Sequence, residues 1–316
     1  MTTTRASFLA VAAALAALPA LGGKARADDL VVRTGLIPAD IGAAAEFARE
    51  LGYFRDAGLD VEIELMQSGP AIAPAVIGGS LSVGAMNSGS LAGAHERGLP
   101  LLYFAPAATT PPASLANAIL VRGDAPIHSG ADLNGKTVGI VAVKTLEHAC
   151  MLLWVDKHGG DAKTLKFAEL PYSEMATALQ TGRVDACLAS EPFATLNHGT
   201  TRILAGVFSA MPGPFLSYGY FATESWLAAN ADAATKYAAA IHRAATWANS
   251  HKKESGDMVA TLTKLDPALV ATMARTQYAT TLEASAIQPA IDVMVTYGML
   301  PTTIDASTLI WKPASR

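Results

Sequence analysis

The chain has little cysteine and no clustered metal ligands. Two of its 316 residues are cysteines, Cys150 and Cys187, and no group of His or Cys stands beside either one at the spacing of a metal site. This scarcity excludes a disulfide-framed fold and disfavours zinc binding and thiol chemistry. In an oxidising compartment the two thiols could pair or stay as separate buried side chains, and the sequence leaves both open.

Positive charge is also scarce. The chain has 23 Lys and Arg against 27 Asp and Glu, a formal net charge of -4. Nucleic-acid binding depends on clustered cations that displace counterions, so this balance disfavours a nucleic-acid partner. A G-x-S-x-G elbow, a P-loop and an H-E-x-x-H pair are likewise missing from the sequence. We therefore expect a protein that is not an enzyme and that uses no cofactor and no metal.

No apolar run reaches the roughly 20 residues that a membrane-spanning helix requires. The run Phe8–Leu18 follows Arg5 and leads to the small-x-small sequence Ala25-Arg26-Ala27, the layout of a cleaved secretory signal. We expect residues 1–27 to be a signal peptide and the mature chain to reside in the periplasm. Without this leader, 20 cations face 27 acids, a formal charge of -7.

After the leader, short apolar runs alternate with helical stretches, as in an α/β fold with mostly parallel strands. The clearest strand is Leu59–Leu65, where apolar and acidic residues alternate with a period of two. The Pro-rich stretches 109–112 and 211–214 interrupt the alternation and indicate two crossings between lobes. We expect two α/β lobes joined by a two-stranded hinge, with an interlobe ligand cleft. The lobes are residues 28–121 with 215–316, and residues 122–214.

Four segments carry a family resemblance when taken together and in order. They are GYFRDAGLDV at 52–61, GSLSVG at 79–84, DLNGKTVG at 132–139 and LQTGRVDA at 179–186, with Glu191-Pro192 close behind. In this order they resemble the nitrate, sulfonate, taurine and pyrimidine-precursor group of periplasmic solute-binding proteins.

The resemblance implies a type II periplasmic binding fold that closes over a small-molecule ligand. It also implies delivery of that ligand to an ABC permease and its ATPase, and we expect the chain to act as a monomer. An enzyme of pyrimidine-precursor biosynthesis with the same fold, or an exported ligand-sensing subunit, are the alternatives.

Ligands of open α/β sheets lie at the loops that follow the strands. In the first lobe we expect contacts from such loops and from the helix starts beside them. A polar residue at these positions serves equally well as a helix cap. The candidates are Ile37, Pro38, Asp40, Ser68, Gly69, Asn87, Ser88, Thr109 and Thr110.

In the second lobe, the loop with Lys144, Thr145, Glu147 and His148 opens a helix directly after a strand. In sulfonate-type relatives this loop resembles a Gly-Ser-Thr anion cradle, which bulky and acidic residues replace here. If Glu147 and Glu191 both face the cleft, they suit an amine, an amidine or an aminopyrimidine, whereas Lys144 suits a carboxylate. A small nitrogen heterocycle, an amine or an aromatic carboxylate is therefore favoured over sulfonate or nitrate.

Aromatic residues could add a platform for a ring in the ligand. Tyr218 and Tyr220 share one face of a predicted strand, so both would lie along the same side of the cleft. Aromatic strand residues more often belong to a core. The further candidates of this kind are Tyr172 and Phe193.

Overall fold

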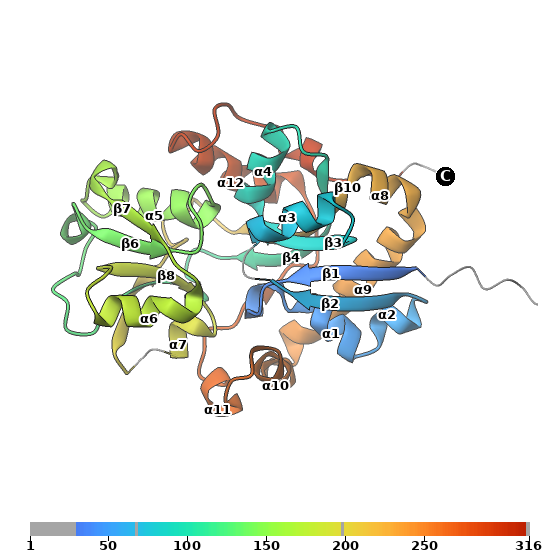
Figure 1. The fold of residues 1–316 in the computed structure, drawn as a ribbon, viewed down its shortest axis with the longest axis horizontal. Coiled ribbons are helices and arrows are strands. Elements are labelled where there is room, and N and C mark those ends of the chain that lie inside the picture. The colour runs from blue at the N-terminus through green and yellow to red at the C-terminus, as the bar shows by residue number, and fades with distance from the viewer. Residues whose placement is uncertain (1–29, 67–68, 197–198, 314–316) are drawn as a thin grey trace, which may run out of the picture. The chain divides into compact units, whose positions relative to one another are not determined.

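A computed structural model describes residues 30–66, 69–196 and 199–313, so the predicted signal peptide and Ser68 lie outside the described residues. Residues from Val31 onward form one compact unit. This unit is a mixed α/β structure with two sheets, which confirms the predicted fold class. Figure 1 shows the two sheets and the helices around them.

The first sheet has the strand order β11-β4-β10-β3-β1-β2. β1 pairs in parallel with β2 and β3, whereas β10 runs antiparallel to β3 and β4. The alternating segment predicted as a strand forms β2, which confirms that prediction. The bounds are Val31–Leu36 for β1, Asp60–Leu65 for β2, Val83–Asn87 for β3, Leu101–Thr110 for β4, Phe215–Thr223 for β10 and Gln277–Tyr278 for β11.

The second sheet has the order β7-β6-β8-β5-β9. Its strands are β5 (Asn117–Arg122), β6 (Thr137–Ile140), β7 (Lys166–Glu169), β8 (Ala186–Ser190) and β9 (Thr201–Gly206). The chain therefore changes sheet between Thr110 and Asn117 and returns between Gly206 and Phe215. β5 pairs with β8 and β9, although the lobe boundary expected at residue 121 groups it with the first lobe.

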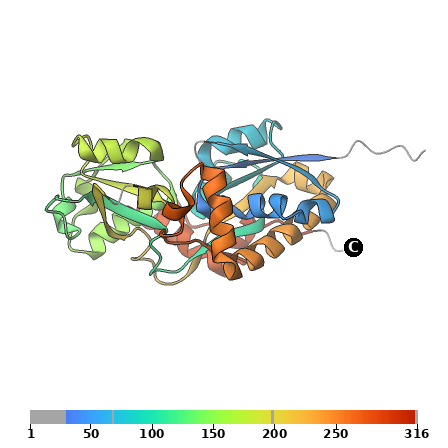
Figure 2. The same cartoon turned by 90° about the horizontal axis from the view of Figure 1, so that it is seen from below.

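Helices cover both faces of each sheet (Figures 1 and 2). Gly52 adopts φ 76° and separates the first two α-helices of the chain. The helices are α1 (Ala44–Glu50), α2 (Tyr53–Asp56), α3 (Gly69–Ile77), α4 (Ser88–Glu96), α5 (Leu146–Lys157), α6 (Tyr172–Gln180), α7 (Phe193–Leu196), α8 (Glu224–Ala229), α9 (Ala231–Ser250), α10 (Lys252–Thr263), α11 (Pro267–Val270) and α12 (Ala284–Thr296).

Three apolar cores hold these layers together. One lies between the first sheet and α1, α2, α9 and α10, and another between the second sheet and α6. The remaining core is shared by both sheets, because α5 packs against α12 and α4. A Cβ added at Gly89 of α4 would lie 3.1 Å from atoms of both Leu146 in α5 and Met294 in α12. Helices from the two parts of the fold are therefore in apolar contact along this side.

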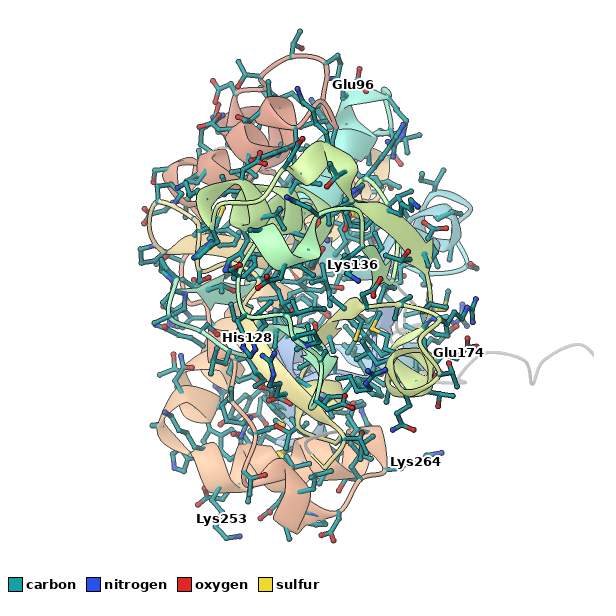
Figure 3. All side chains as sticks on the ribbon, turned by 90° about the vertical axis from the view of Figure 1, so that its left-hand side faces the viewer. Glu96, His128, Lys136, Glu174, Lys253 and Lys264 are labelled. Atoms are coloured by element: carbon teal, nitrogen blue, oxygen red, sulfur yellow. The ribbon has the colours of Figure 1, made fainter. Side chains whose placement is uncertain are left out.

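Many charged side chains lie on the outside of these layers. Glu96, Lys253 and Lys264 are exposed, and Figure 3 shows them projecting away from the ribbon. Cys150 and Cys187 are both buried and free, so the structure contains no bond between them. Within the described ranges, no helix has the length and apolarity needed to cross a membrane.

Candidate functional site

Polar side chains from both sheets meet where β3 and β8 end and β5 begins. Asn87 closes β3, Ser190 closes β8 and Asn117 opens the antiparallel β5, so all three lie at the ends of their strands. Glu147 in the first turn of α5 and Tyr172 at the start of α6 complete the group. We call these five residues the central polar cluster.

A hydrogen bond across the two sheets organises one half of the cluster. The Asn87 side-chain amide donates from Nδ2 to Glu147 Oε2 at 2.8 Å. The Asn87 Oδ1 atom accepts the Ser90 amide at 2.7 Å, so the same residue also caps α4. Burial raises the pKa of Glu147 because a partly dry site disfavours the charged carboxylate. The carboxylate therefore gains from any further N–H donor that approaches it.

A chain of hydroxyl contacts forms the other half. Ser190 Oγ donates to Asn117 Oδ1 at 2.5 Å, and the Tyr172 hydroxyl lies 3.0 Å from Ser190 Oγ. The Tyr172 ring stacks on Phe193 with 5.2 Å between ring centroids. This stacking fixes the phenol at the wall of a cavity that Glu147 also lines.

That cavity is small. Its volume is about 10 Å³, space for about one water molecule. Its lining includes Asn117, Glu147, Tyr172 and Ser190 and contains no lysine or arginine. It is too small for an organic solute, and its lining offers a carboxylate, hydroxyls and amides rather than a cation.

The loop before α5 is shaped by its own side chains. Lys144 has φ 58°, and its backbone N–H donates to His148 Nδ1 at 3.0 Å. The His148 ring contacts Phe167, and burial lowers its pKa to about 4. Thr145 caps α5 by accepting the His148 amide at 3.4 Å. Of the four candidates in this loop, Glu147 joins the central polar cluster, while Lys144 is exposed and the other two hold the turn.

Asp40 lies in a buried ion pair. Its side chain is 1% exposed, and Arg275 Nη2 lies 3.0 Å from Oδ1. Oδ1 also accepts the Tyr278 hydroxyl at 2.6 Å, and Oδ2 accepts the Thr276 amide at 2.7 Å. The Asp40 carboxylate therefore accepts hydrogen bonds from the protein's own donors. It joins segments that are far apart in the sequence.

Glu191 was expected to face the ligand together with Glu147. It is 2% exposed, and its carboxylate accepts the Thr195 amide at 3.0 Å and the Thr195 hydroxyl at 2.8 Å. Oε1 also accepts the amide of Ala274 at 3.1 Å. The Glu191 backbone carbonyl accepts the Asp40 amide at 3.3 Å. These contacts make Glu191 a connector between the second sheet and segments of the first.

Most other candidates in the first lobe belong to strands, helix starts or the apolar core. Ser88 donates to the Leu216 carbonyl at 2.5 Å, and Thr110 donates to Ser217 at 2.7 Å. Thr109 and Thr110 belong to β4, because the strand continues into the first half of the stretch 109–112, where a break was expected. Ile37 is buried in a core, Pro38 is half-buried and Gly69 opens α3.

The two strand tyrosines are core residues. The Tyr220 hydroxyl donates to the Gly42 carbonyl at 3.0 Å and accepts the Ala45 amide at 2.9 Å. Tyr218 donates to the Ala85 carbonyl at 3.3 Å. Both rings pack in the same core.

Sequence reasoning missed Asn117 and Ser190. Ser190 ends a strand and precedes Glu191, so its position after an apolar run was an available signal. The sequence contains no such signal for Asn117, because this residue opens its strand. It joins the cluster only because β5 runs antiparallel to β8.

The sites lack the features of metal or thiol chemistry. Among the described residues, no three His, Cys, Asp or Glu side chains converge in a way that could hold a metal ion. Burial raises the pKa of Cys187 to about 12 and that of Cys150 well above its ordinary value. Neither thiol is set up as a thiolate nucleophile.

Known proteins resemble this chain along most of its length. A Brucella abortus (strain 2308) protein, whose name describes it only as a binding protein, is 25% identical over 316 residues, covering 95% of both chains. The alkanesulfonate-binding protein of Xanthomonas axonopodis pv. citri, solved with MOPS, has a TM-score of 0.74 at 20% identity and covers 89% of this chain and 98% of its own.

A desulfurization enzyme has a related fold, with a TM-score of 0.63 at 14% identity and coverage of 89% of this chain and 96% of its own. At these identities the two solved structures establish similarity of fold. A sequence model of the NMT1/THI5-like family matches residues 43–255, which is more than half of the chain. The chain therefore belongs to the NMT1/THI5-like family.

Proposed function

We propose that this protein is the solute-binding component of an ABC importer. Two sheets joined by two chain crossings, with a polar cluster drawn from both, suit capture of a small molecule by closure. Membership of the family and the named binding protein from Brucella support the same role. Its partners would be a small-molecule ligand, a permease and the ATPase of that permease. It would act in the periplasm.

The proposed lobes follow the sheets. One lobe contains the first sheet with the C-terminal helices, and the other contains the second sheet with α5, α6 and α7. The crossings at Pro111–Ala116 and Val207–Pro214 then form the hinge. Because the cavity at the cluster holds about one water, we propose that a solute enters when the lobes part and is enclosed when they close.

The choice of ligand rests on the surroundings of the Glu147 carboxylate. This carboxylate is held from the opposite sheet by Asn87, sits in a site that raises its pKa and has no cation beside it in the cavity lining. A cationic or N–H-donating solute satisfies such a carboxylate, whereas an anion meets repulsion. We propose an organic nitrogen compound, such as an amine, an amidine or an aminopyrimidine, stacked near Tyr172.

A thermal-shift panel tests this proposal. Organic nitrogen solutes should raise the melting temperature of the wild type. Glu147→Gln should bind the best of them tenfold or more weakly, a loss of about 1.4 kcal/mol. Glu174→Gln is the matched control, because Glu174 is an exposed residue of α6 paired with Arg183. Stabilisation by sulfate, nitrate or taurine alone would reject the proposed ligand class.

An enzyme is disfavoured by the burial of both thiols and by the structural use of His148. The related fold of the desulfurization enzyme does not change this, since fold alone does not define chemistry. An exported sensing subunit would bind the same solute and differ only in its partner. Co-purification with a permease distinguishes the two roles.

A further inference from the structure

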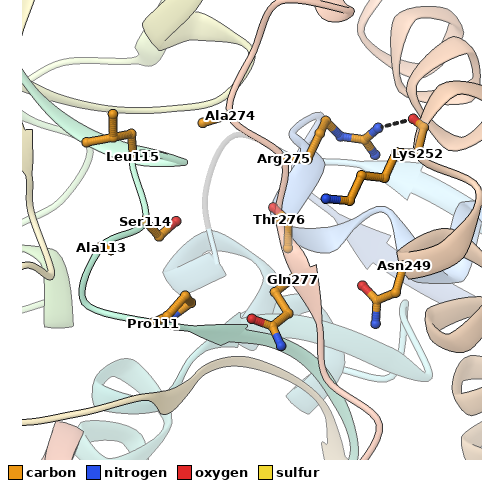
Figure 4. Close-up of a pocket in the computed structure, with 10 residues that line it drawn as sticks. All are labelled: Pro111, Ala113, Ser114, Leu115, Asn249, Lys252, Ala274, Arg275, Thr276 and Gln277. Carbon is orange, nitrogen blue, oxygen red and sulfur yellow. Dashed lines mark hydrogen bonds between the residues drawn. The ribbon is translucent and has the colours of Figure 1, made fainter.

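A larger cavity lies away from the central polar cluster. Its volume is about 620 Å³, within the range of small-molecule sites. One wall is the crossing from β4 to β5, at Pro111–Leu115, and the other is Ala274–Gln277, which leads into β11. Asn249 and Lys252 close it at the junction of α9 and α10 (Figure 4). We call it the back pocket; it shares no lining residue with the cavity of the cluster.

The charges of the back pocket favour an anion. Lys252 and Arg275 line it, and no Asp or Glu does, although acids outnumber bases in the chain. The Arg275 guanidinium is neutralised by Asp40 at 3.0 Å. The Lys252 ammonium pairs with no acceptor among the described residues, and Figure 4 shows it directed toward Thr276. One positive charge, on an exposed side chain with no acid in the lining, therefore faces the pocket.

Polar groups with unused donors surround that charge. The Thr276 hydroxyl and the Gln277 side-chain amide have no partner in the described part of the chain. Ser114 Oγ accepts the Ala116 amide at 3.2 Å, which leaves its own O–H free to donate. Pro111 and Leu115 add an apolar surface. We propose that the back pocket is a second binding site, for a small organic carboxylate with an apolar or aromatic body.

The back pocket is connected to the lobe interface through Ala274–Thr276. The Ala274 amide donates to Glu191 at 3.1 Å, and the Thr276 amide donates to Asp40 at 2.7 Å. The opposite wall is one of the two crossings that form the proposed hinge. A change in the angle between lobes would therefore alter both walls, and a carboxylate that prefers one angle would shift the closure equilibrium. This coupling, unlike the site itself, rests on the proposed function.

Titration of the full mature chain with benzoate, followed by NMR and calorimetry, tests the site. Benzoate should bind saturably, and benzamide, which has the same shape without charge, should bind at least tenfold more weakly. Lys252→Met should weaken benzoate binding by tenfold or more, because it keeps the stem and removes the charge. Lys253→Met is the control, since Lys253 is exposed and pairs with Asp257 at 2.8 Å. Gln277→Ala is a second variant, expected to weaken benzoate severalfold.

Three results would overturn the site: no saturable benzoate binding, equal binding of benzamide, or unchanged affinity in both pocket variants. Glu147→Gln should leave benzoate binding intact, which separates failure of this site from failure of the proposed solute site. Small-angle scattering tests the coupling. Saturating benzoate should change the radius of gyration of the wild type but not of Lys252→Met, and an unchanged radius in the wild type would refute the coupling.

Discussion

The ion pair of Asp40 and Arg275 gives the sharpest stability prediction. The change is Arg275→Met, which keeps much of the side-chain volume and removes the charge. Asp40 is 1% exposed and Arg275 14% exposed at the side chain, so the pair is almost fully withdrawn from water. Removing one member of a buried pair leaves an uncompensated charge and costs about 3–5 kcal/mol. The hydrogen bonds that Thr276 and Tyr278 donate to Asp40 remain in the variant. They should keep the loss of stability near the lower end of this range.

This loss is large compared with the stability of an ordinary protein, about 5–15 kcal/mol. For a chain of this size, 1 kcal/mol moves the melting temperature by about 2–4 °C, so the expected drop is about 6–20 °C. Calorimetry and urea unfolding measure it directly.

Two further variants complete this test. Arg243→Met removes an exposed ion pair, in which Arg243 and Asp56 are 52% and 55% exposed at their side chains, and should cost less than about 1 kcal/mol. Combining Asp40→Asn with Arg275→Met should recover part of the loss, because both charges are gone. If Arg275→Met melted within 1–2 °C of the wild type, the pair would not be the buried connection described above.

Three smaller predictions concern the loops around the central polar cluster. Glu191→Ala should lower the free energy of unfolding by about 1–3 kcal/mol in urea, because the amides of Thr195 and Ala274 lose their acceptor; an unchanged midpoint would contradict this role. Burial lowers the pKa of His148 to about 4, so its contribution to stability is lost as pH falls from its ordinary value near 6.5 through 4, and His148→Gln should show a smaller fall in melting temperature over that range. Burial raises the pKa of Glu147, so its contribution is lost as pH rises above its ordinary value, and Glu147→Gln should melt higher than the wild type at neutral pH but not in acid.

Local patterns predicted much of the fold. The alternation in Leu59–Leu65 predicted β2. Such signals depend on neighbours in sequence, so a single chain displays them. β9 escaped prediction because Thr201–Gly206 mixes polar and apolar residues without a clear period. Its identity as a strand depends on pairing with β5.

The candidate site was predicted only in part, for a different physical reason. Asn87 and Glu147 were both recognised as helix-start residues, but their contact joins positions 60 residues apart. The partners of Asp40 lie 235 to 238 residues away, so nothing near it revealed a buried ion pair. A carboxylate after a strand has the same local sequence whether it binds a solute or holds two segments together, and only the tertiary contacts separate the two roles.

A crystal structure with the most stabilising solute of the panel tests the central claim most directly. We predict a solute enclosed between the two sheets, with a nitrogen donor within hydrogen-bonding distance of the Glu147 carboxylate and with contacts to Asn87 and Tyr172. A solute bound on one sheet alone, or an anion held by Lys144 with Glu147 turned away, would contradict the account.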